Sequence, residues 1–199
     1  VGERLKWIMD VFADKVYNPK LKRQEVFFDK NYNAIIDLYS YGHDIETAWL
    51  MDRGVDVLNN EHYREKMTPI TKTLTSRIYQ VAFDGHSLAN ECDRGVVNAH
   101  RVWWVQAETV VGFLNGYERN TGHSEYCDAA LAEWEFIKYA ASAETQSTWS
   151  QATGYLPINL GTKDLDDYKA FVEKTPAVEL ALEQFEYSNP MVQEPVMMM

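Results

Sequence analysis

Apolar residues recur along most of the chain with the spacing of an α-helix. In the first turns they fall close to a period of 3.6, at Leu5, Ile8, Met9, Phe12 and Val16. The same periodicity predicts further helices over residues 43–59, 68–81, 98–119 and 124–141. Because these segments follow one another without a convincing run of alternating strands, the sequence predicts an all-α fold of helical hairpins.

The helix around Pro69 has two interpretations. Thr68 followed by Pro69 is a favourable start, with a hydroxyl N-cap before a proline at the first helical position. However, Tyr63 and Met67 continue the apolar face upstream. One longer helix kinked at Pro69 is therefore the alternative.

Two stretches break the helical pattern. Residues 84–97 carry Gly85 and Gly95 among mixed charges and are predicted to form a loop. After about residue 140 the helical pattern of apolar and polar positions changes again, and residues 154–159 cannot be helical throughout. Short amphipathic segments come after them, so we expect a helical tail behind the main body.

Composition and charge narrow the function. The chain has 199 residues, of which 46% are hydrophobic and 25% charged, as in an ordinary globular protein. Its net charge of −11 disfavours nucleic acid and anionic membrane surfaces as partners. No apolar run approaches the ~20 residues that span a bilayer, so membrane insertion is not expected. Aromatic residues make up 13%, which suits a sugar site but equally an aromatic-rich helical core.

A first cluster of chemically useful residues lies near the start of the helix predicted over 43–59. His43 and Glu46 are three residues apart, as are Glu46 and Trp49, so the three side chains share one helix face. Histidine is the side chain best suited to proton transfer near neutral pH. The alternative is structural, with a satisfied histidine at the helix start, a capping carboxylate and a tryptophan in the core.

A second cluster lies on the helix predicted over 98–119. Trp104 and Glu108 are four residues apart and share a face, while Trp103 turns about 100° away. The indole ring can pack on sugar C–H bonds, and the carboxylate can accept hydrogen bonds from sugar hydroxyls. Core packing of the tryptophan beside a solvated Glu108 is the alternative.

Several common kinds of site leave no trace in the sequence. There is no zinc or calcium ligand spacing, no glycine-rich phosphate loop and no motif centred on a nucleophilic serine. We therefore expect neither a metal nor a cofactor.

Taken in this order, the two clusters resemble the N-acylglucosamine 2-epimerase family, which includes the cellobiose 2-epimerases. The matching strings are SYGHDIETAWL at residues 40–50 and VWWVQAE at residues 102–108. The resemblance covers residues 1–138 and implies an (α/α)6 barrel with a central sugar pocket.

The resemblance also implies roles for the clustered residues. His43 would be one of two histidine acid/base catalysts, and Glu46 would support the sugar or that histidine. The residues expected to line the pocket are Trp49, Trp104 and Glu108. The implied reaction removes the C2 proton of an open-chain aldose, or of the reducing end of a disaccharide, and returns it to the other face through a cis-enediolate. A small-molecule sugar is thus the expected partner.

The family pattern is incomplete in this chain. A second catalytic histidine and an arginine from the family's N-terminal half are missing, so we expect an incomplete toroid without turnover of its own. Opening a toroid exposes apolar faces, which predicts self-association.

Residues 139–199 resemble a different family. The strings YAASAETQ at 139–146 and WSQATGYLPI at 149–158 look like the C-terminal part of an extracellular solute-binding protein of an ABC transporter, of the glycerol-3-phosphate or sugar type. That resemblance implies that Tyr155 lies near the ligand; the alternative is that Tyr155 packs a turn.

Three functional hypotheses therefore stay open. Residues 1–138 predict a cytoplasmic sugar 2-epimerase or isomerase, whereas the tail resembles an extracytoplasmic transport protein. The string EFIKYA at 135–140 fits both families. The third hypothesis is accordingly a chimera of two gene fragments without activity of its own.

Overall fold

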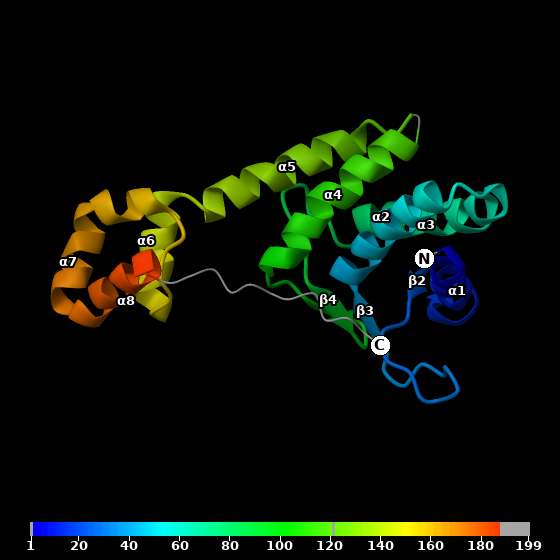
Figure 1. The fold of residues 1–199 in the computed structure, drawn as a ribbon, viewed down its shortest axis with the longest axis horizontal. Helices are drawn as coiled ribbons and strands as arrows, with labels where there is room; N and C mark the ends of the chain where they lie inside the picture. The colour runs from blue at the N-terminus through cyan, green and yellow to red at the C-terminus, as the bar shows by residue number, and fades with distance from the viewer. Residues whose placement is uncertain (1, 121, 188–199) are drawn as a thin grey trace. The chain divides into compact units, whose positions relative to one another are not determined.

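The computed structural model describes residues 2–120 and 122–187, which form mainly helices (Figure 1). They divide into two compact units, with the boundary between Ile137 and Lys138. The helices of the first unit are α1 (Gly2–Val11), the π-helical turn η1 (Phe12–Val16), α2 (Tyr41–Leu58), α3 (Glu61–Val81), α4 (Trp103–Arg119) and α5 (Glu125–Ala140), the last of which crosses the boundary. The second unit contains α6 (Ala143–Thr153), η2 (Leu160–Asp164), α7 (Asp166–Lys174) and α8 (Pro176–Tyr187).

The prediction of a loop over residues 84–97 is wrong, because this stretch contains most of a β-hairpin. Strands β4 (Glu91–Asp93) and β5 (Val96–Asn98) pair antiparallel, and β3 (Leu38–Ser40) joins the other edge of β4. The tight turn between β4 and β5 places Arg94 at φ 47° and Gly95 at φ 81°. A two-residue turn with positive φ at both positions has a backbone twist that matches the right-handed twist of the strands it connects. Helix α4 consequently begins at Trp103, later than residue 98.

A second small hairpin precedes β3. Strands β1 (Tyr17–Asn18) and β2 (Arg23–Gln24) pair antiparallel. Short ladders of this kind are too brief to produce a periodic signal in the sequence.

Helix α3 decides between the two interpretations of Pro69. The helix runs from Glu61 to Val81 with Pro69 inside it, and it does not start at Thr68. Its N-cap is Asn60, whose side-chain oxygen accepts a hydrogen bond from the backbone N–H of Tyr63 at 3.3 Å. The residue before it, Asn59, ends α2 in the left-handed conformation, so α2 and α3 form a tight helical hairpin.

Helix α2 packs against both α3 and α4. Two glycines allow the close approach of α2 and α4. A Cβ atom on Gly112 of α4 would lie 2.3 Å from Cγ1 of Ile45, and one on Gly42 of α2 would lie 2.6 Å from the Trp104 ring. No larger residue fits at either position without moving a helix, so this pair of glycines fixes how α4 lies along α2.

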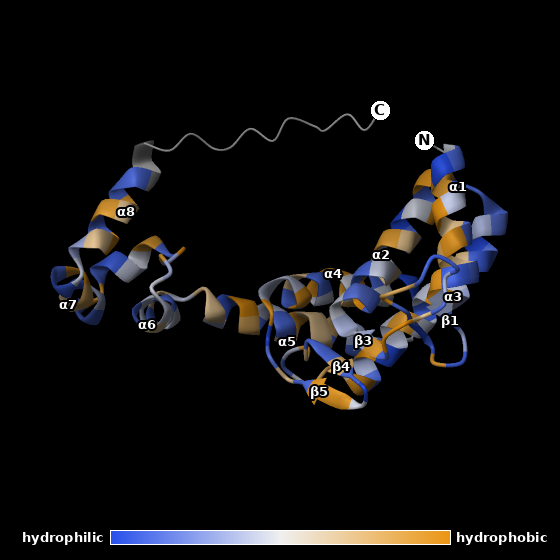
Figure 2. Ribbon diagram, turned by 90° about the horizontal axis from the view of Figure 1, so that it is seen from below, coloured by the Kyte–Doolittle hydropathy of each residue, from blue (hydrophilic) through white to orange (hydrophobic). Residues whose placement is uncertain are grey.

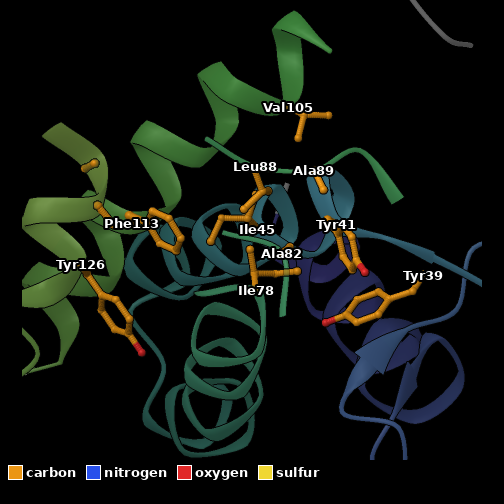
Figure 3. Packing of buried hydrophobic residues seen from close by; sticks show 12 residues of the cluster. Tyr39, Tyr41, Ile45, Ile78, Ala82, Leu88, Ala89, Val105, Phe113 and Tyr126 are labelled. Carbon is orange, nitrogen blue, oxygen red and sulfur yellow. The ribbon is translucent and has the colours of Figure 1, made fainter. Parts of the chain in front are cut away.

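Two apolar clusters stabilise the first unit. The larger one joins α2, the C-terminal half of α3, α4 and α5 to the strand region. Figure 3 shows Phe113 and Tyr126 at one end of it and Tyr39 and Tyr41 at the other, with Ile45 between them. The smaller cluster packs α1 and η1 against α2 and α3. Burial of this apolar surface is the main favourable contribution to the stability of the unit.

Apolar side chains also remain on the surface of the first unit. Strand β5 is hydrophobic in Figure 2, and Val96 and Val97 are 72% and 50% exposed. Trp103 at the start of α4 is 80% exposed. Among the described residues, no helix combines the length and the apolar character that crossing a bilayer requires.

Candidate active site

The start of α2 is built around a contact between Ser40 and His43. Ser40 occupies the N-cap position, but its hydroxyl makes no hydrogen bond to the helix backbone. Instead, its Oγ lies 2.6 Å from Nδ1 of His43. A hydrogen bond at Nδ1 fixes the orientation of the ring and leaves Nε2 as the other nitrogen of the imidazole. His43 itself is exposed.

The indole of Trp104 lies beside this imidazole. The ring centroids of His43 and Trp104 are 5.0 Å apart with planes inclined at 52°. The residue between β3 and His43 that permits this contact is Gly42, because a Cβ there would collide with the Trp104 ring. The two predicted clusters, some sixty residues apart in sequence, therefore meet on one surface of α2 and α4.

A second contact joins the same two helices further along. Nε1 of Trp49 donates a hydrogen bond to Oε2 of Glu108 at 2.7 Å. This bond uses the indole N–H, so Trp49 can offer a ligand only its ring. Only Oε2 of Glu108 takes part in this bond.

Glu46 lies on the same face of α2, half-buried between these two contacts. Burial raises the pKa of its carboxyl, and the negative charge of Glu108 raises it further, while His43 opposes the shift. A carboxyl whose pKa is moved toward neutrality is better suited to hold and release a proton than an ordinary surface glutamate.

Sequence reasoning missed the supporting roles of Ser40 and Asp44. Asp44 is fully buried, and its Oδ1 accepts a hydrogen bond from the backbone N–H of Gln24 at 3.1 Å. Burial holds the pKa of Asp44 well above its ordinary value. This bond ties the start of α2 to strand β2. The available signal was the position of Ser40 and Asp44 directly around His43 in the sequence.

Tyr155 belongs to the second unit and is 70% exposed. It follows Gly154, which ends α6 at φ 76°, and its backbone N–H donates to Oγ1 of Thr153 at 3.3 Å. A ligand-binding role for Tyr155 stays a prediction. No group of three or more His, Cys, Asp or Glu side chains in residues 2–120 and 122–187 is placed to hold a metal ion.

One imidazole, two indoles and two carboxylates therefore lie on the paired helices α2 and α4. The sequence profile of N-acylglucosamine 2-epimerase (GlcNAc 2-epimerase) matches residues 3–154. The chain belongs to this family. The match extends past residue 138, so the placing of a domain boundary there stays a prediction.

Curated relatives support the same assignment. The chain is 47% identical over 137 residues to a cellobiose 2-epimerase of Eubacterium cellulosolvens, which covers 69% of this chain and 34% of the relative. It is 41% identical over 138 residues to a cellobiose 2-epimerase of Ruminococcus albus, covering 69% and 35%. The chain thus spans about a third of the length of these relatives.

Solved structures agree on the fold. A sugar epimerase from a ruminal bacterium superposes with a TM-score of 0.66 at 40% identity, covering 68% of this chain and 35% of the other. Cellobiose 2-epimerase of Bacillus thermoamylovorans gives the same TM-score at 36% identity, covering 69% and 35%. The fold is therefore an incomplete (α/α)6 toroid followed by a helical tail, as the resemblance implied.

A separate, shorter similarity concerns 57 residues of the chain. These are 35% identical to the sn-glycerol-3-phosphate-binding periplasmic protein UgpB of Pectobacterium atrosepticum, covering 29% of this chain and 13% of the relative. This short, partial similarity gives only loose support to the resemblance of the tail to a solute-binding protein.

Proposed function

We propose that the surface shared by α2 and α4 is one side of a sugar 2-epimerase site. The observation that carries the proposal is the imidazole of His43, with Nδ1 at 2.6 Å from Ser40 Oγ and its ring against Trp104. This arrangement orients a base and places an aromatic surface next to it. Both features suit a saccharide that loses a proton from carbon.

In the proposed reaction, Nε2 of His43 takes the proton from C2 of an open-chain aldose. The electron pair of the C–H bond moves to form the C1–C2 double bond of a cis-enediolate, and negative charge develops on O1. Trp104 packs on the sugar, and Oε1 of Glu108 accepts a hydroxyl hydrogen bond. Glu46, whose pKa is raised by burial, holds a hydrogen bond to the sugar or to the imidazole.

Inversion at C2 requires a second acid that delivers a proton to the opposite face. The family resemblance implies a second histidine for this step, and none was assigned in this chain. We therefore propose that the 199-residue chain exchanges the C2 proton but forms no epimer, which makes it inactive as an epimerase by itself.

The test is incubation with cellobiose, glucose or mannose in D2O, followed by NMR. The expected result is deuterium at C2 without the C2 epimer. Replacement His43→Gln should lower the exchange rate by about 100-fold, the lower range for loss of a general base. The matched control is His62→Gln, a change at an exposed position on α3, and it should leave the exchange rate unchanged. Exchange that survives His43→Gln would refute the assigned base, and formation of epimer would show that a second acid is present.

A second candidate function concerns the second unit. The 57-residue similarity to a glycerol-3-phosphate-binding protein favours a solute-binding ancestry for part of the chain. If that function survives, glycerol 3-phosphate should bind, and Tyr155→Ala should weaken it at least tenfold. Tyr139→Ala, a similarly exposed tyrosine in the same unit, is the control. If glycerol 3-phosphate does not bind, the similarity reflects common ancestry without a retained binding function. That result is expected for the proposed chimera of two gene fragments.

We also propose that the chain associates with itself through exposed apolar side chains of the open toroid. Leu50, Val111 and Leu114 on α2 and α4 are each more than 40% exposed. Size-exclusion chromatography with light scattering should show species above 23.0 kDa. A sharp monomer peak at micromolar concentration would contradict this.

A further inference from the structure

A hollow of about 450 Å³ lies over the outward face of α3, away from the residues of the candidate active site. Its walls come from α3, from the α4–α5 connection and the start of α5, and from the turn between β1 and β2. The lining residues are Lys22, Lys72, Thr73, Ser76, Arg77, Gln80, Asn120, His123 and Tyr126. Three of them are lysine or arginine, and none is aspartate or glutamate. In a chain with a net charge of −11, such a lining is a local reversal of sign.

Arg77 distinguishes this hollow from an ordinary basic surface. In the described part of the chain Arg23, Arg64, Arg94, Arg101 and Arg119 each form an ion pair with a carboxylate. Arg77 makes no such pair there, and of the arginines without one it is half-buried whereas Arg4 and Arg53 are exposed; its buried Nε, like that of Arg23, has no hydrogen-bond partner. A partly buried guanidinium without an anion is costly, and an anionic ligand would relieve that cost.

The other cationic groups are held in place around Arg77. Lys22 adopts a positive φ of 56°, and its backbone N–H donates to the carbonyl of Asn18 at 2.8 Å. This conformation closes the turn between β1 and β2. The opposite wall carries His123, whose Nδ1 lies 2.7 Å from Oε1 of Glu125, which leaves Nε2 for a ligand.

The polar neighbours supply hydrogen-bond donors as well as charge. Gln80 uses one amide N–H on Ser76 at 3.2 Å and Asn120 uses one on the carbonyl of Gly116 at 2.9 Å, so each amide keeps a second N–H donor. Together with the ammonium groups and the guanidinium, this is a donor-rich set that a dianion with several oxygen acceptors would satisfy. A carboxylate ligand has fewer acceptor oxygens than a phosphate and would use fewer of these donors. A neutral sugar would leave the positive charges of the lining without a partner.

We propose that this hollow binds a phosphate group, free or carried by a small molecule. The geometry provides charge from Lys22, Lys72 and Arg77 and a volume large enough for a phosphorylated monosaccharide or a mononucleotide. The site is independent of the epimerase proposal, since it shares no residue with it.

Isothermal titration of the whole chain at low ionic strength tests the proposal. The probes are inorganic phosphate, glucose 6-phosphate, AMP and glucose. At least one phosphorylated probe should bind with one-site stoichiometry, while glucose should not bind at this site. Comparing phosphate with the two esters distinguishes a free anion from a phosphorylated small molecule. Saturable phosphate binding should also weaken as salt is added.

Two double variants distinguish binding in the hollow from non-specific attraction of an anion to surface lysines. Lys22→Gln with Lys72→Gln removes two exposed charges from the lining and should weaken binding at least about tenfold. The matched control, Lys20→Gln with Lys30→Gln, removes two exposed charges outside it and should change affinity less than about twofold. Equal loss in both pairs, or no saturable binding of any phosphorylated probe, overturns the proposal.

Discussion

The two units of the chain bury different kinds of side chain. In the first unit, residues such as Ile45, Leu74 and Phe113 are fully buried in apolar clusters. In the second unit the fully buried residues include the polar Ser147 and Thr162 beside Tyr168, and several of its large apolar side chains are exposed. Ile158 and Leu160, for example, are 77% and 79% exposed.

The difference indicates what holds each unit together. Apolar burial contributes about 25 cal/mol per Å², whereas a typical hydrogen bond contributes only about 1 kcal/mol net. The first unit should therefore unfold cooperatively through loss of its core. The second unit depends on polar contacts such as Ser147 with Asp167 and should open at lower denaturant concentration.

The largest expected effect is that of Phe113→Ala in the first unit. Phe113 is fully buried and its ring stacks on Tyr126 at 6.0 Å and meets Phe83 edge-on at 5.5 Å. Truncation should leave a cavity and lower the free energy of unfolding of this unit by about 4 kcal/mol. Urea unfolding followed by hydrogen exchange, read separately for each unit, checks this.

The same experiment needs a control from the exposed apolar residues. Leu160→Ala in the second unit removes a side chain of which 79% is already in water, so it should change stability by less than about 0.5 kcal/mol. If Phe113→Ala were equally mild, the first unit would not depend on its core, and the contrast between the units would fail.

The next largest effect concerns Glu133 on α5, an ionisable group inside the apolar unit. Glu133 is fully buried, and neither carboxylate oxygen has a hydrogen-bond partner among the described residues. Burial raises its pKa to about 8 from 4.5. The folded state therefore holds a proton that the unfolded chain releases, and stability should fall as pH rises from about 4.5 to 8. Within this range stability should fall by up to about 1.4 kcal/mol for each pH unit.

Glu133→Gln isolates this contribution. Denaturant unfolding of the chain and of the variant between pH 4.5 and 9 should converge at the acidic end and diverge toward pH 8, with the variant more stable. Glu65→Gln on the exposed face of α3 should follow the unsubstituted chain at every pH. Parallel curves for all three proteins would mean that Glu133 is ionised in the folded state.

The helices of the first unit could be predicted because their apolar periodicity is long. Helix α2 was expected over 43–59 and is found at Tyr41–Leu58. The β4–β5 hairpin was missed because each strand has only three residues. The sequence did contain a turn signal, since Asp93-Arg94-Gly95 can supply the positive φ values that a two-residue hairpin turn needs.

The candidate site could be predicted only within each helix. Spacing placed His43 and Glu46 on one face, but it gave no information on which helix lies opposite. The contact between His43 and Trp104 depends on Gly42, a close approach between segments sixty residues apart in sequence. Such tertiary contacts carry no local pattern, so the family resemblance rather than periodicity pointed to them.

Gly112→Ala tests that close approach and should have a smaller effect than the two changes above. The added Cβ would lie 2.3 Å from Cγ1 of Ile45 and 3.0 Å from its backbone oxygen, so α4 must move away from α2. The expected destabilisation is about 2 kcal/mol after the gain in helix propensity. Gly54→Ala is the control, because its Cβ would meet mainly the flexible end of Met9 and should cost less than about 0.5 kcal/mol. Equal effects would mean that the α2–α4 spacing does not depend on Gly112.

The smallest expected effect returns to the second unit and its polar contacts. Ser147 is fully buried on α6, and its hydroxyl donates to Oδ2 of Asp167 on α7 at 2.6 Å, where Gln151 also donates at 3.0 Å. Ser147→Ala removes one of these donors and should lower the melting midpoint of the second unit by about 4 °C without moving that of the first. Thr148→Ala, on the exposed side of the same helix, should leave both midpoints in place. Trp149 is the one tryptophan after residue 138, so the difference in fluorescence between the chain and its Trp149→Phe variant reports the second unit. A shift of both midpoints together with Ser147→Ala would show that the two units unfold as one, and that their different interiors do not make them independent.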